Sequence, residues 1–281
     1  MKTFELINFG SNFLKHNNIE TNTIDSEIIL SHVMGITREN ILVSDKEIDQ
    51  VEIAKFKSLL LRRSKNEPIA YITKKKEFRS TDFYIDKNSL IPRPETELLI
   101  DPIVKYFKRK SLFFLDIGVG SGCIMLSILK ELKHAKAIGT DISKKTIINA
   151  KINLRKLKIH NRAKILCKSF EKINNYEFDL VVSNPPYVAK RDINRLKRDV
   201  KSYEPILALN GGNDGLDVIK KVIYKSRSIL KINGILALEI GRGQYQSVLR
   251  ILENNNFREL KKIIDYRNNV RCIFSTLLRK K

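Results

Sequence analysis

The fold of this chain is decided by the stretch Phe113-Phe114-Leu115-Asp116-Ile117-Gly118-Val119-Gly120-Ser121-Gly122. An apolar run of strand length leads directly into three glycines spaced two residues apart, and the apolar segment Ile124–Leu132 follows with the length of a helix. Glycine tolerates positive φ and lets a ligand approach the backbone, while the first turn of a helix offers free N–H groups. The stretch predicts a strand, a ligand-binding turn and a helix, although nicotinamide-binding folds share such a turn.

Apolar runs of strand length alternate with helical segments around this stretch. The predicted strands are Leu112–Ile117, Ala137–Thr140, Ala163–Leu166, Leu180–Ser183 and Ile235–Glu239. The predicted helices between and after them are Ile124–Leu132, Thr146–Leu157, Leu216–Leu230 and Gln246–Asn254. This alternation is typical of an α/β fold, in which helices cover both faces of a parallel sheet. We expect a Rossmann-like domain over residues 96–281.

The residues before this domain have a different pattern. Residues 4–66 predict short helices, and the first of these helices has an apolar stripe of Phe4, Ile7, Phe9, Phe13 and Leu14. From residue 69 to residue 90 the pattern changes to short β-like pieces, and the prolines at 92 and 94 exclude a helix or a central strand. We expect a small N-terminal helical domain over residues 1–75 and a β-hairpin with a proline linker over residues 76–95.

The composition is that of an ordinary globular protein. The 281 residues are 42% hydrophobic and 30% charged, which excludes a disordered or collagen-like chain. No run of 18 uncharged apolar residues occurs, so we expect no membrane span and no membrane partner. The three cysteines, Cys123, Cys167 and Cys272, and the four histidines have no disulfide or metal-ligand spacing. We expect a cytoplasmic protein without a metal site.

The net charge of +22 is unevenly distributed along the chain. Residues 1–50 carry 4 basic and 8 acidic side chains, whereas residues 51–281 carry 49 basic and 23 acidic ones. A basic surplus of this size attracts polyanions through counterion release, and it would favour transient proximity to RNA or the ribosome. A biased genome composition rich in lysine, isoleucine and asparagine explains the same surplus, so both interpretations stay open.

Two aspartates near the glycine turn indicate what kind of ligand it binds. Asp116 comes just before the first glycine, and a carboxylate there would repel a pyrophosphate but attract a positively charged or donor-rich group. Asp141 follows the next predicted strand about 20 residues later, where an acidic side chain suits the hydroxyls of a ribose. The aminoacyl group and the ribose of S-adenosylmethionine meet both conditions.

A second motif, Asn184-Pro185-Pro186-Tyr187, follows the predicted strand that ends at Ser183. The side-chain oxygen of Asn184 and the carbonyl oxygen of Pro185 are two acceptors that match the two hydrogens of a planar NH₂ group. Proline has no N–H that could compete for these acceptors. The arrangement orients a poorly nucleophilic nitrogen for in-line attack on a methyl group. We expect Tyr187 to cover or stack on the planar group.

The two motifs together resemble those of S-adenosylmethionine-dependent amino methyltransferases, and further segments resemble the release factor glutamine methyltransferases, the HemK/PrmC family. The resemblance extends from about residue 1 to residue 275, and its most specific segment is Leu90-Ile91-Pro92-Arg93-Pro94-Glu95-Thr96-Glu97. The other segments are Glu67-Pro68-Ile69-Ala70-Tyr71-Ile72, Phe83-Tyr84, Tyr203-Glu204-Pro205, Gly211-Gly212-Asn213-Asp214-Gly215-Leu216-Asp217 and Leu238-Glu239-Ile240-Gly241. The resemblance implies a class I methyltransferase that methylates the side-chain amide nitrogen (N5) of the glutamine in the Gly-Gly-Gln loop of peptide chain release factors.

The resemblance also implies roles for individual residues. The cofactor-binding positions fall on Gly118, Val119, Gly120, Ser121, Gly122, Asp141, Phe170 and Asn184, with Phe170 against the adenine. The substrate-binding positions fall on Asn184, Pro185, Pro186 and Tyr187, and the expected catalytic residues are Asn184, Pro185 and Tyr187. One glutamine side chain offers too little surface for selection, so we expect residues 1–75 to recognise the release factor. We expect the enzyme to be a monomer.

Four positions depart from the pattern of the family. Lys74 stands where a glycine is frequent, Arg79 replaces a common aromatic residue, and Asn268 stands in for a glycine. Ser169 precedes Phe170 where an acidic residue is usual. None of the four positions belongs to the motif that would hold the amide.

Two other functions stay open on the sequence alone. A nucleic-acid adenine N6-methyltransferase would bind an exocyclic amine with the same pattern of two hydrogens, but it would need base flipping and a target-recognition region. The net acidic residues 1–50 suit a protein partner better than a DNA backbone. A non-catalytic RNA- or ribosome-binding protein on a methyltransferase fold would have no need of an intact Asn184–Tyr187 motif.

Overall fold

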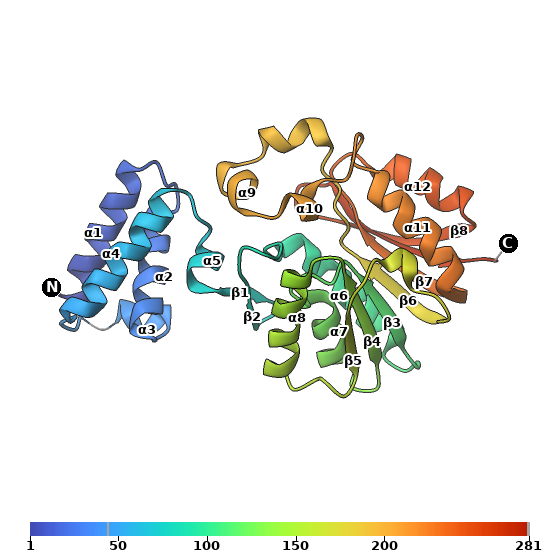
Figure 1. Ribbon diagram of the computed structural model, residues 1–281, viewed down its shortest axis with the longest axis horizontal. Coiled ribbons are helices and arrows are strands. Elements are labelled where there is room, and N and C mark those ends of the chain that lie inside the picture. The colour runs from blue at the N-terminus through green and yellow to red at the C-terminus, as the bar shows by residue number, and fades with distance from the viewer. Residues whose placement is uncertain (44, 280–281) are drawn as a thin grey trace. The chain divides into compact units, whose positions relative to one another are not determined.

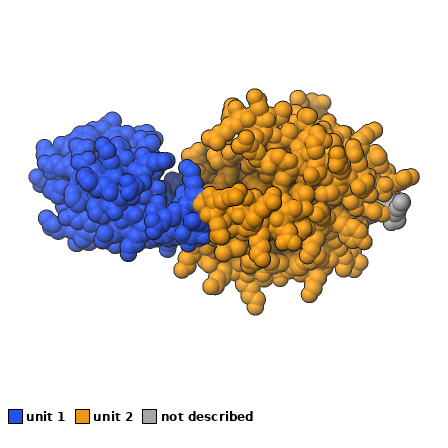
Figure 2. All heavy atoms as spheres, turned by 90° about the horizontal axis from the view of Figure 1, so that it is seen from above, with its two compact units in different colours: residues 1–75, 197–203 blue, residues 76–196, 204–281 orange. Residues whose placement is uncertain are grey.

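A computed structural model describes residues 1–43 and 45–279 of the chain (Figure 1). These residues divide into two compact units, one of residues 1–43, 45–75 and 197–203, and one of residues 76–196 and 204–279 (Figure 2). The membership of residues 197–203 in the first unit differs from the expected domain boundaries, which placed all of residues 96–281 together. Among the described residues, no helix has the length and apolar character needed to cross a membrane.

The first unit is built from short helices, which confirms the expected helical N-terminal region. They are α1 (Thr3–His16), α2 (Asn22–Met34), α3 (Arg38–Leu42), α4 (Gln50–Ser64), α5 (Ile69–Thr73) and α9 (Arg198–Tyr203). The Asp49 side chain starts α4, because it accepts a hydrogen bond of 2.7 Å from the Glu52 amide. The fully buried residues of this unit include Leu6, Leu14, Ile29, Leu30, Phe56 and Leu60. The unit therefore has its own apolar core.

Two details of the expectation for this unit are wrong. α1 buries Leu6, Ile7 and Leu14, whereas Phe4 and Phe9 of the expected stripe are each 42% exposed. Residues 69–73 form α5 instead of a β segment. The cause is local, because Pro68 precedes the first turn and Lys74 ends the helix in the left-handed region at a φ of 55°.

The second unit contains a seven-stranded sheet. Its strands are β3 (Phe113–Ile117), β4 (Lys136–Asp141), β5 (Ala163–Cys167), β6 (Phe178–Ser183), β7 (Leu230–Glu239), β8 (Phe257–Ile264) and β9 (Val270–Leu277). The strand order is β5-β4-β3-β6-β7-β9-β8, and the pairs from β5 to β7 are parallel. The five predicted strands and the α/β fold class are thereby confirmed.

The last two strands were not predicted from the sequence, and they make the sheet mixed. β9 pairs antiparallel with β7, and β8 pairs antiparallel with β9 at the edge of the sheet. Along β8, most residues are exposed or half-buried, and the strand carries the charged side chains of Arg258, Glu259, Lys261 and Lys262. Charged side chains are frequent on edge strands because they discourage pairing with other chains. They also interrupt the apolar run that indicates a buried strand, so β8 was not predicted from the sequence.

Helices cover both faces of this sheet. They are α6 (Ile100–Phe107), α7 (Cys123–Glu131), α8 (Lys144–Lys156), α11 (Asp217–Ile229) and α12 (Tyr245–Asn254). Leu115 and Ile117 of β3 share a buried core with side chains of α11 and α12. Because side chains alternate along a strand, Asp116 points to the opposite face, where its Oδ2 accepts a hydrogen bond of 3.1 Å from the Met125 amide in α7. β3 is therefore buried on both sides.

Shorter elements complete the second unit. β1 (Lys75–Phe78) and β2 (Thr81–Tyr84) form a two-stranded hairpin, and the 3₁₀ helix η1 (Pro94–Leu99) leads into α6. Asn153 of α8 holds the hairpin in place, since it exchanges hydrogen bonds of 2.7 and 3.0 Å with the amide and carbonyl of Tyr84. The remaining short helices are η2 (Phe170–Lys172), η3 (Lys190–Arg195) and α10 (Ile206–Leu209).

Candidate active site

The strand order brings the two sequence motifs to one edge of the sheet. β3 and β6 are parallel neighbours, and Ile117 at the end of one pairs with Ser183 at the end of the other. Gly118 and Asn184 are the next residues, so the glycine turn and the Asn184–Tyr187 motif leave the sheet together. From β3 the chain continues to β4 and β5 on one side, and from β6 to β7 on the other. Ligands of open α/β sheets bind at such a reversal of strand order.

A cavity of ≈ 370 Å³ lies at this edge of the sheet. The predicted site residues that line it are Gly118, Gly120, Asp141, Phe170, Asn184, Pro185 and Pro186. Further lining residues, which the sequence analysis did not single out, include Asn88, Ser89, Thr146, Lys168, Leu207 and Ala208. A second hollow, of ≈ 660 Å³, lies among residues of α12 and β8 and contains none of the predicted site residues. The smaller cavity is therefore the candidate active site.

The glycine turn presents its backbone to the cavity. Gly118 and Gly120 have φ angles of 74° and 55°, and a Cβ on Gly118 would meet nothing within 4 Å. Glycine is therefore required there by backbone conformation and by the open cavity, not by packing. The amides of Gly118 and Val119 both donate to the Thr140 carbonyl at 2.9 Å, and the Gly120 amide donates to Asp141 Oδ2 at 3.3 Å. Because these donors are already engaged, the turn suits an uncharged or cationic ligand better than a phosphate.

The other three predicted residues of the turn lie outside the cavity lining. The Val119 side chain is 3% exposed and lies close to Gly139 of β4, and Ser121 is 2% exposed. Gly122 begins α7 with a φ of 87°. These residues support the conformation of the turn from outside the cavity. Their assignment as cofactor-binding positions stays a prediction.

The two aspartates of the turn are in different environments. Asp141 lines the cavity, and its Oδ1 accepts a 2.9 Å hydrogen bond from the Ser143 amide. Burial raises the pKa of Asp141, although its hydrogen bonds to backbone amides oppose the rise. Asp116 is 1% exposed and does not line the cavity, and its Oδ1 has no hydrogen-bond partner among the residues that the structure describes. Burial raises its pKa to about 7, so half of its charge is absent near neutral pH.

The Asn184 carboxamide faces the cavity with its nitrogen already bound. Nδ2 of Asn184 donates a hydrogen bond of 3.1 Å to the Thr96 hydroxyl in η1, which leaves Oδ1 available. Pro185 and Pro186 line the cavity beside it. The Asn184–Pro186 segment therefore offers carbonyl-type oxygens, and no proline N–H, to a ligand.

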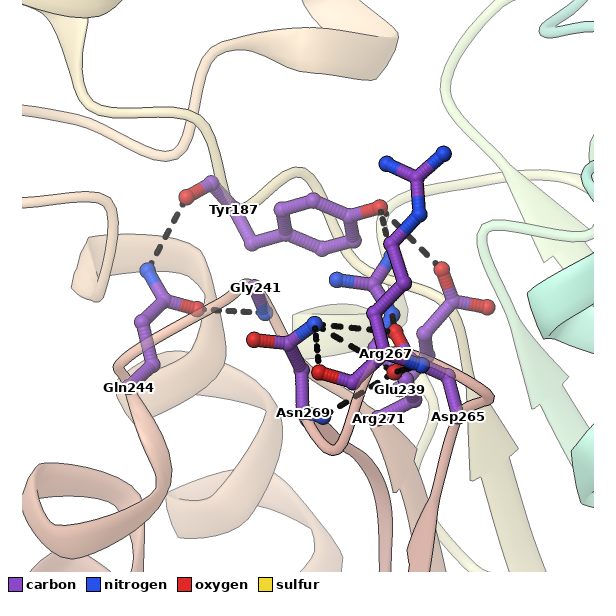
Figure 3. Close-up of polar contacts among 8 residues, drawn as sticks. All are labelled: Tyr187, Glu239, Gly241, Gln244, Asp265, Arg267, Asn269 and Arg271. Carbon is purple, nitrogen blue, oxygen red and sulfur yellow. Dashed lines mark hydrogen bonds and ion pairs between the residues drawn. The ribbon is translucent and has the colours of Figure 1, made fainter.

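Tyr187 is held on the far side of this segment. Its hydroxyl lies 3.2 Å from Glu239 Oε1 and 3.4 Å from Arg271 Nη2, as Figure 3 shows. Tyr187 does not line the cavity, so a role in covering the target amide stays a prediction. Burial raises the pKa of the Tyr187 hydroxyl far above its usual range, and the neighbouring Glu239 carboxylate adds to the rise. Tyr187 is therefore a neutral hydrogen-bond donor.

A glycine-rich loop and one glutamine support the backbone of the same motif. A Cβ on Gly215 would lie 2.4 Å from the Tyr187 carbonyl oxygen, and a Cβ on Gly211 would lie 2.8 Å from that of Pro186. Only glycine permits this close approach. Gln244 Nε2 donates to the Tyr187 carbonyl at 3.0 Å, while its Oε1 accepts from the Gly241 amide at 2.8 Å (Figure 3). The Gly211–Asp217 segment therefore packs directly against the backbone of the motif.

The proline block is tied to the segment that follows the motif. Arg93 forms an ion pair with Glu204, which is 5% exposed, and the Ile91 amide donates to the same carboxylate at 3.2 Å. Two segments that resemble the family, Leu90–Glu97 and Tyr203–Pro205, thus meet through one carboxylate. Pro205, Leu207 and Ala208 then form part of the cavity wall.

Comparisons with known proteins agree with this geometry. The family model of the PrmC N-terminal domain matches residues 5–73, and that of the methyltransferase small domain matches residues 94–201. A release factor glutamine methyltransferase from Clostridium acetobutylicum is 38% identical over 269 residues, which are 93% of this chain and 94% of that protein. The chain belongs to the release factor glutamine methyltransferase family. The resemblance inferred from the sequence is thereby confirmed.

Other members and relatives extend this comparison. A release factor glutamine methyltransferase from Caulobacter vibrioides is 35% identical, with 92% of this chain and 91% of that protein covered. A bifunctional methyltransferase from Rickettsia typhi is 36% identical over 90% of this chain, which corresponds to 53% of the longer relative. That relative is therefore a longer protein than this chain.

Solved structures support the fold alone. A methyltransferase from Pyrococcus furiosus has a TM-score of 0.53 and 17% identity, with 78% of this chain and 96% of that one covered. The ribosomal protein L11 methylase from Lactobacillus delbrueckii subsp. bulgaricus has a TM-score of 0.51 and 17% identity, with 66% and 81% covered. The Rossmann-like methyltransferase fold is thereby confirmed.

Proposed function

We propose that this chain transfers the methyl group of S-adenosylmethionine to the side-chain amide nitrogen of the glutamine in the Gly-Gly-Gln motif of peptide chain release factors. The observation that carries the proposal is the Asn184 carboxamide, whose nitrogen is engaged by Thr96 and whose oxygen is available at the cavity. The names of the family members cited above support the same reaction.

The glycine side of the cavity fits S-adenosylmethionine. Gly118 and Gly120 leave open space beside their backbones, Asp141 presents a carboxylate for ribose hydroxyls, and Phe170 offers a ring for the adenine. Few backbone donors are free for a phosphate, which favours this cofactor over a dinucleotide. When bound, S-adenosylmethionine supplies an electrophilic methyl group on a cationic sulfur. Val119, Ser121 and Gly122 would hold the turn, and Asn184 would contact both cofactor and substrate.

The amide side of the cavity would bind the nucleophile. Asn184 Oδ1 and the Pro185 carbonyl would accept the two hydrogens of the glutamine NH₂ group, with Pro186 and Tyr187 completing the pocket. Two fixed acceptors align the nitrogen and raise its electron density, so proximity and preorganisation account for the rate. The proton can leave to water after methylation, since a methylated amide nitrogen that carries a positive charge is strongly acidic.

One experiment separates this function from its alternatives. The protein is incubated with methyl-labelled S-adenosylmethionine and, in parallel, with a release factor, with the same factor carrying alanine in place of the Gly-Gly-Gln glutamine, and with adenine-containing DNA and RNA. Mass spectrometry then locates the label. We expect label on the glutamine of the unaltered factor alone. Label on adenine would support the N6-methyltransferase alternative, and no label anywhere would support the non-catalytic one.

We further propose that the first unit selects the release factor. Its support is the net acidic charge of residues 1–50, which differs from the basic remainder of the chain. Contacts remote from the amide supply binding energy that one glutamine cannot. A chain that begins at Lys75 keeps the β1–β2 hairpin, and we expect it to bind S-adenosylmethionine normally. Its kcat/KM on the intact factor should fall about tenfold or more, which corresponds to the loss of at least ~1.4 kcal/mol.

A milder, full-length variant controls for damage to the fold. Glu20, Glu39 and Glu47 are exposed residues of the first unit, and changing all three to glutamine removes charge without removing the helices. We expect a higher KM for the intact factor and an unchanged rate on a short Gly-Gly-Gln peptide. If both substrates slow equally in both variants, residues 1–75 act by covering apolar surface and not by recognition.

We also propose that the enzyme works as a cytoplasmic monomer, close to the ribosome. The support is the net charge of +26 over residues 51–281, which would attract RNA, and the three cysteines, none of which is paired. Co-sedimentation with ribosomes at low and high salt tests the charge, because counterion release makes such binding weaken steeply with salt. Light scattering of the purified protein measures its molar mass and so tests whether it is a monomer.

A further inference from the structure

A buried chain of polar side chains lies behind the cavity. Glu239 ends β7 and is 0% exposed, and Thr96 in η1 is 2% exposed. The β6–β7 register explains their closeness to the site, because Ser183 pairs with Leu238 and the next residues are Asn184 and Glu239. The Thr96 hydroxyl interacts with the Glu239 carboxylate and also accepts the 3.1 Å hydrogen bond from Asn184 Nδ2. Thr96 thus connects the site to a buried acid.

The direction of each hydrogen bond in this chain follows from donors and acceptors that cannot exchange roles. Arg271 can only donate, so at 3.4 Å the Tyr187 oxygen accepts from it and the Tyr187 proton turns to Glu239 Oε1 at 3.2 Å (Figure 3). When Glu239 is ionised, its carboxylate can only accept, and the proton of the neighbouring Thr96 hydroxyl then turns to it as well. The Thr96 oxygen is then left to accept from the NH₂ group of Asn184. Asn184 Oδ1 consequently faces the cavity.

The groups around Glu239 act against one another, and their net effect raises the pKa of its carboxyl above the ordinary value, chiefly through burial. Burial raises its pKa, while the Thr96 hydroxyl, the Arg271 guanidinium and the Tyr187 hydroxyl each oppose the rise. Glu95, a neighbouring negative charge, raises the pKa of Glu239. Glu239 Oε2 has no hydrogen-bond partner among the described residues, and the Thr96 hydroxyl lies near enough to the carboxyl to lower its pKa.

We infer that Thr96 and Glu239 are positioning residues that fix which way the Asn184 carboxamide points. With Oδ1 toward the cavity, Asn184 accepts a hydrogen from the target NH₂ group. Turned by 180°, it would present its own NH₂ group and repel the substrate amide. A free carboxamide samples both orientations, because its oxygen and nitrogen ends are nearly equal in size. The inference rests on the proposed amide methylation, and it gives a chemical role to the threonine of the Leu90–Glu97 segment.

The alternative is that Thr96 only fills space between η1 and the sheet. Two substitutions at one position separate these roles. Thr96→Val keeps the shape but has neither donor nor acceptor, and Thr96→Ser keeps the hydroxyl but loses a methyl group. Thr276 of β9 provides a matched control, because it is also a buried threonine at 5% exposure. It pairs with Ile235 in β7, four residues before Glu239, and so lies away from the carboxyl end of the strand.

The kinetic measurement compares these variants on the intact release factor. We expect Thr96→Val to lower kcat by about tenfold or more, because one preorganised group loses its fixed orientation. The KM and the calorimetric Kd for S-adenosylmethionine should stay within about twofold, because the glycine turn and Asp141 are unchanged and Thr96 itself does not line the cavity. Thr96→Ser should recover most of kcat, and Thr276→Val should match the wild type. A wild-type kcat for Thr96→Val, or a Thr96→Ser variant as slow as Thr96→Val, would overturn the inference.

A substrate-free measurement keeps the inference separable from the proposed function. In protein labelled with ¹⁵N-asparagine, the side-chain NH₂ signals of Asn184 are those that disappear in Asn184→Asp. We expect slow hydrogen exchange of this NH₂ group in the wild type and in Thr96→Ser, and faster exchange in Thr96→Val and Glu239→Gln. Equal exchange in wild type and Thr96→Val overturns the inference. Protected signals in a wild-type protein that methylates no release factor would support the positioning role and reject only the proposed function.

Discussion

The two walls of the cavity are built in different ways. The glycine turn after β3 presents backbone, and each of its φ angles and hydrogen bonds is set within a few residues or by the adjacent strand β4. The Asn184–Tyr187 segment after β6 presents a side chain, whose orientation depends on partners 88 and 52 residues away from Asn184 and Tyr187. A site formed by backbone atoms can thus be predicted from a short stretch of sequence. A site formed by a side chain depends on residues that the fold brings next to it. The predictions below test that difference.

The largest effect is expected on the amide side. Asn184→Ala removes the acceptor for the target NH₂ group, and we expect kcat to fall by about 10²- to 10³-fold, the scale for losing one preorganised hydrogen-bonding group. Cofactor affinity should change much less, because the glycine turn and Asp141 are intact. Steady-state kinetics and calorimetry measure the two quantities. If kcat stays at the wild-type value while the cofactor binds normally, Asn184 does not orient the target amide.

A smaller effect, on stability, is expected behind the glycine turn. The pKa of Asp116 is about 7 in the folded chain against an ordinary value of 3.8, so the folded state holds the proton more tightly than the unfolded state. The contribution of protonated Asp116 to stability is fully present below about pH 4, and it is lost as the pH rises through about 7. Between pH 5 and pH 8 the wild type should therefore lose about 2–3 kcal/mol of unfolding free energy that Asp116→Asn does not lose.

Denaturant unfolding of both proteins at several pH values measures this difference. Asp116→Leu is not a suitable comparison, because it would leave the Met125 amide without its acceptor. Parallel stability curves for the wild type and Asp116→Asn would contradict the prediction. They would mean that Asp116 ionises normally despite its burial.

The smallest effect is expected at the rim of the glycine side. Asp141→Ala should weaken S-adenosylmethionine binding by roughly 1.5–3 kcal/mol, which is the range for hydrogen bonds to a charged group and corresponds to about tenfold to 150-fold. The value of kcat at saturating cofactor should change little. Asp141 also accepts hydrogen bonds from Gly120 and Ser143, so Asp141→Asn serves as a control that keeps a side-chain acceptor near the turn. An unchanged Kd for Asp141→Ala would mean that the ribose hydroxyls bind to other residues.

Much of the candidate site was predictable because its chemistry lies in short segments. Gly118, Gly120, Asp141, Phe170, Asn184, Pro185 and Pro186 were named from the sequence, and the structure places them around one cavity. Val119, Ser121 and Tyr187 were also named, but their side chains do not line the cavity. Spacing along the chain shows that a residue belongs to a turn. It does not show to which side of the turn the side chain points.

The residues that the sequence analysis missed have a common character. Thr96, Glu239 and Gln244 contact the Asn184–Tyr187 motif without belonging to it. Two of them lie inside segments quoted for their resemblance to the family, Leu90–Glu97 and Leu238–Gly241, and that membership was the only available signal. Similarly, Asn88 and Ser89 line the cavity, although they lie in a stretch that the sequence predicted only as short β-like pieces.

The sequence by itself determined the α/β class, the strand–turn–helix at residues 113–132 and the chemistry that Asn184 and the two prolines offer. These features follow from periodicity, glycine conformation and the hydrogen-bonding capacity of single residues, all of which act over a few positions. Only the tertiary structure decided the antiparallel β8–β9 edge, the position of Tyr187 and the orientation of the Asn184 carboxamide. Hydrogen bonds act only at about 3 Å, so their partners are selected by strand order and register and not by distance along the chain.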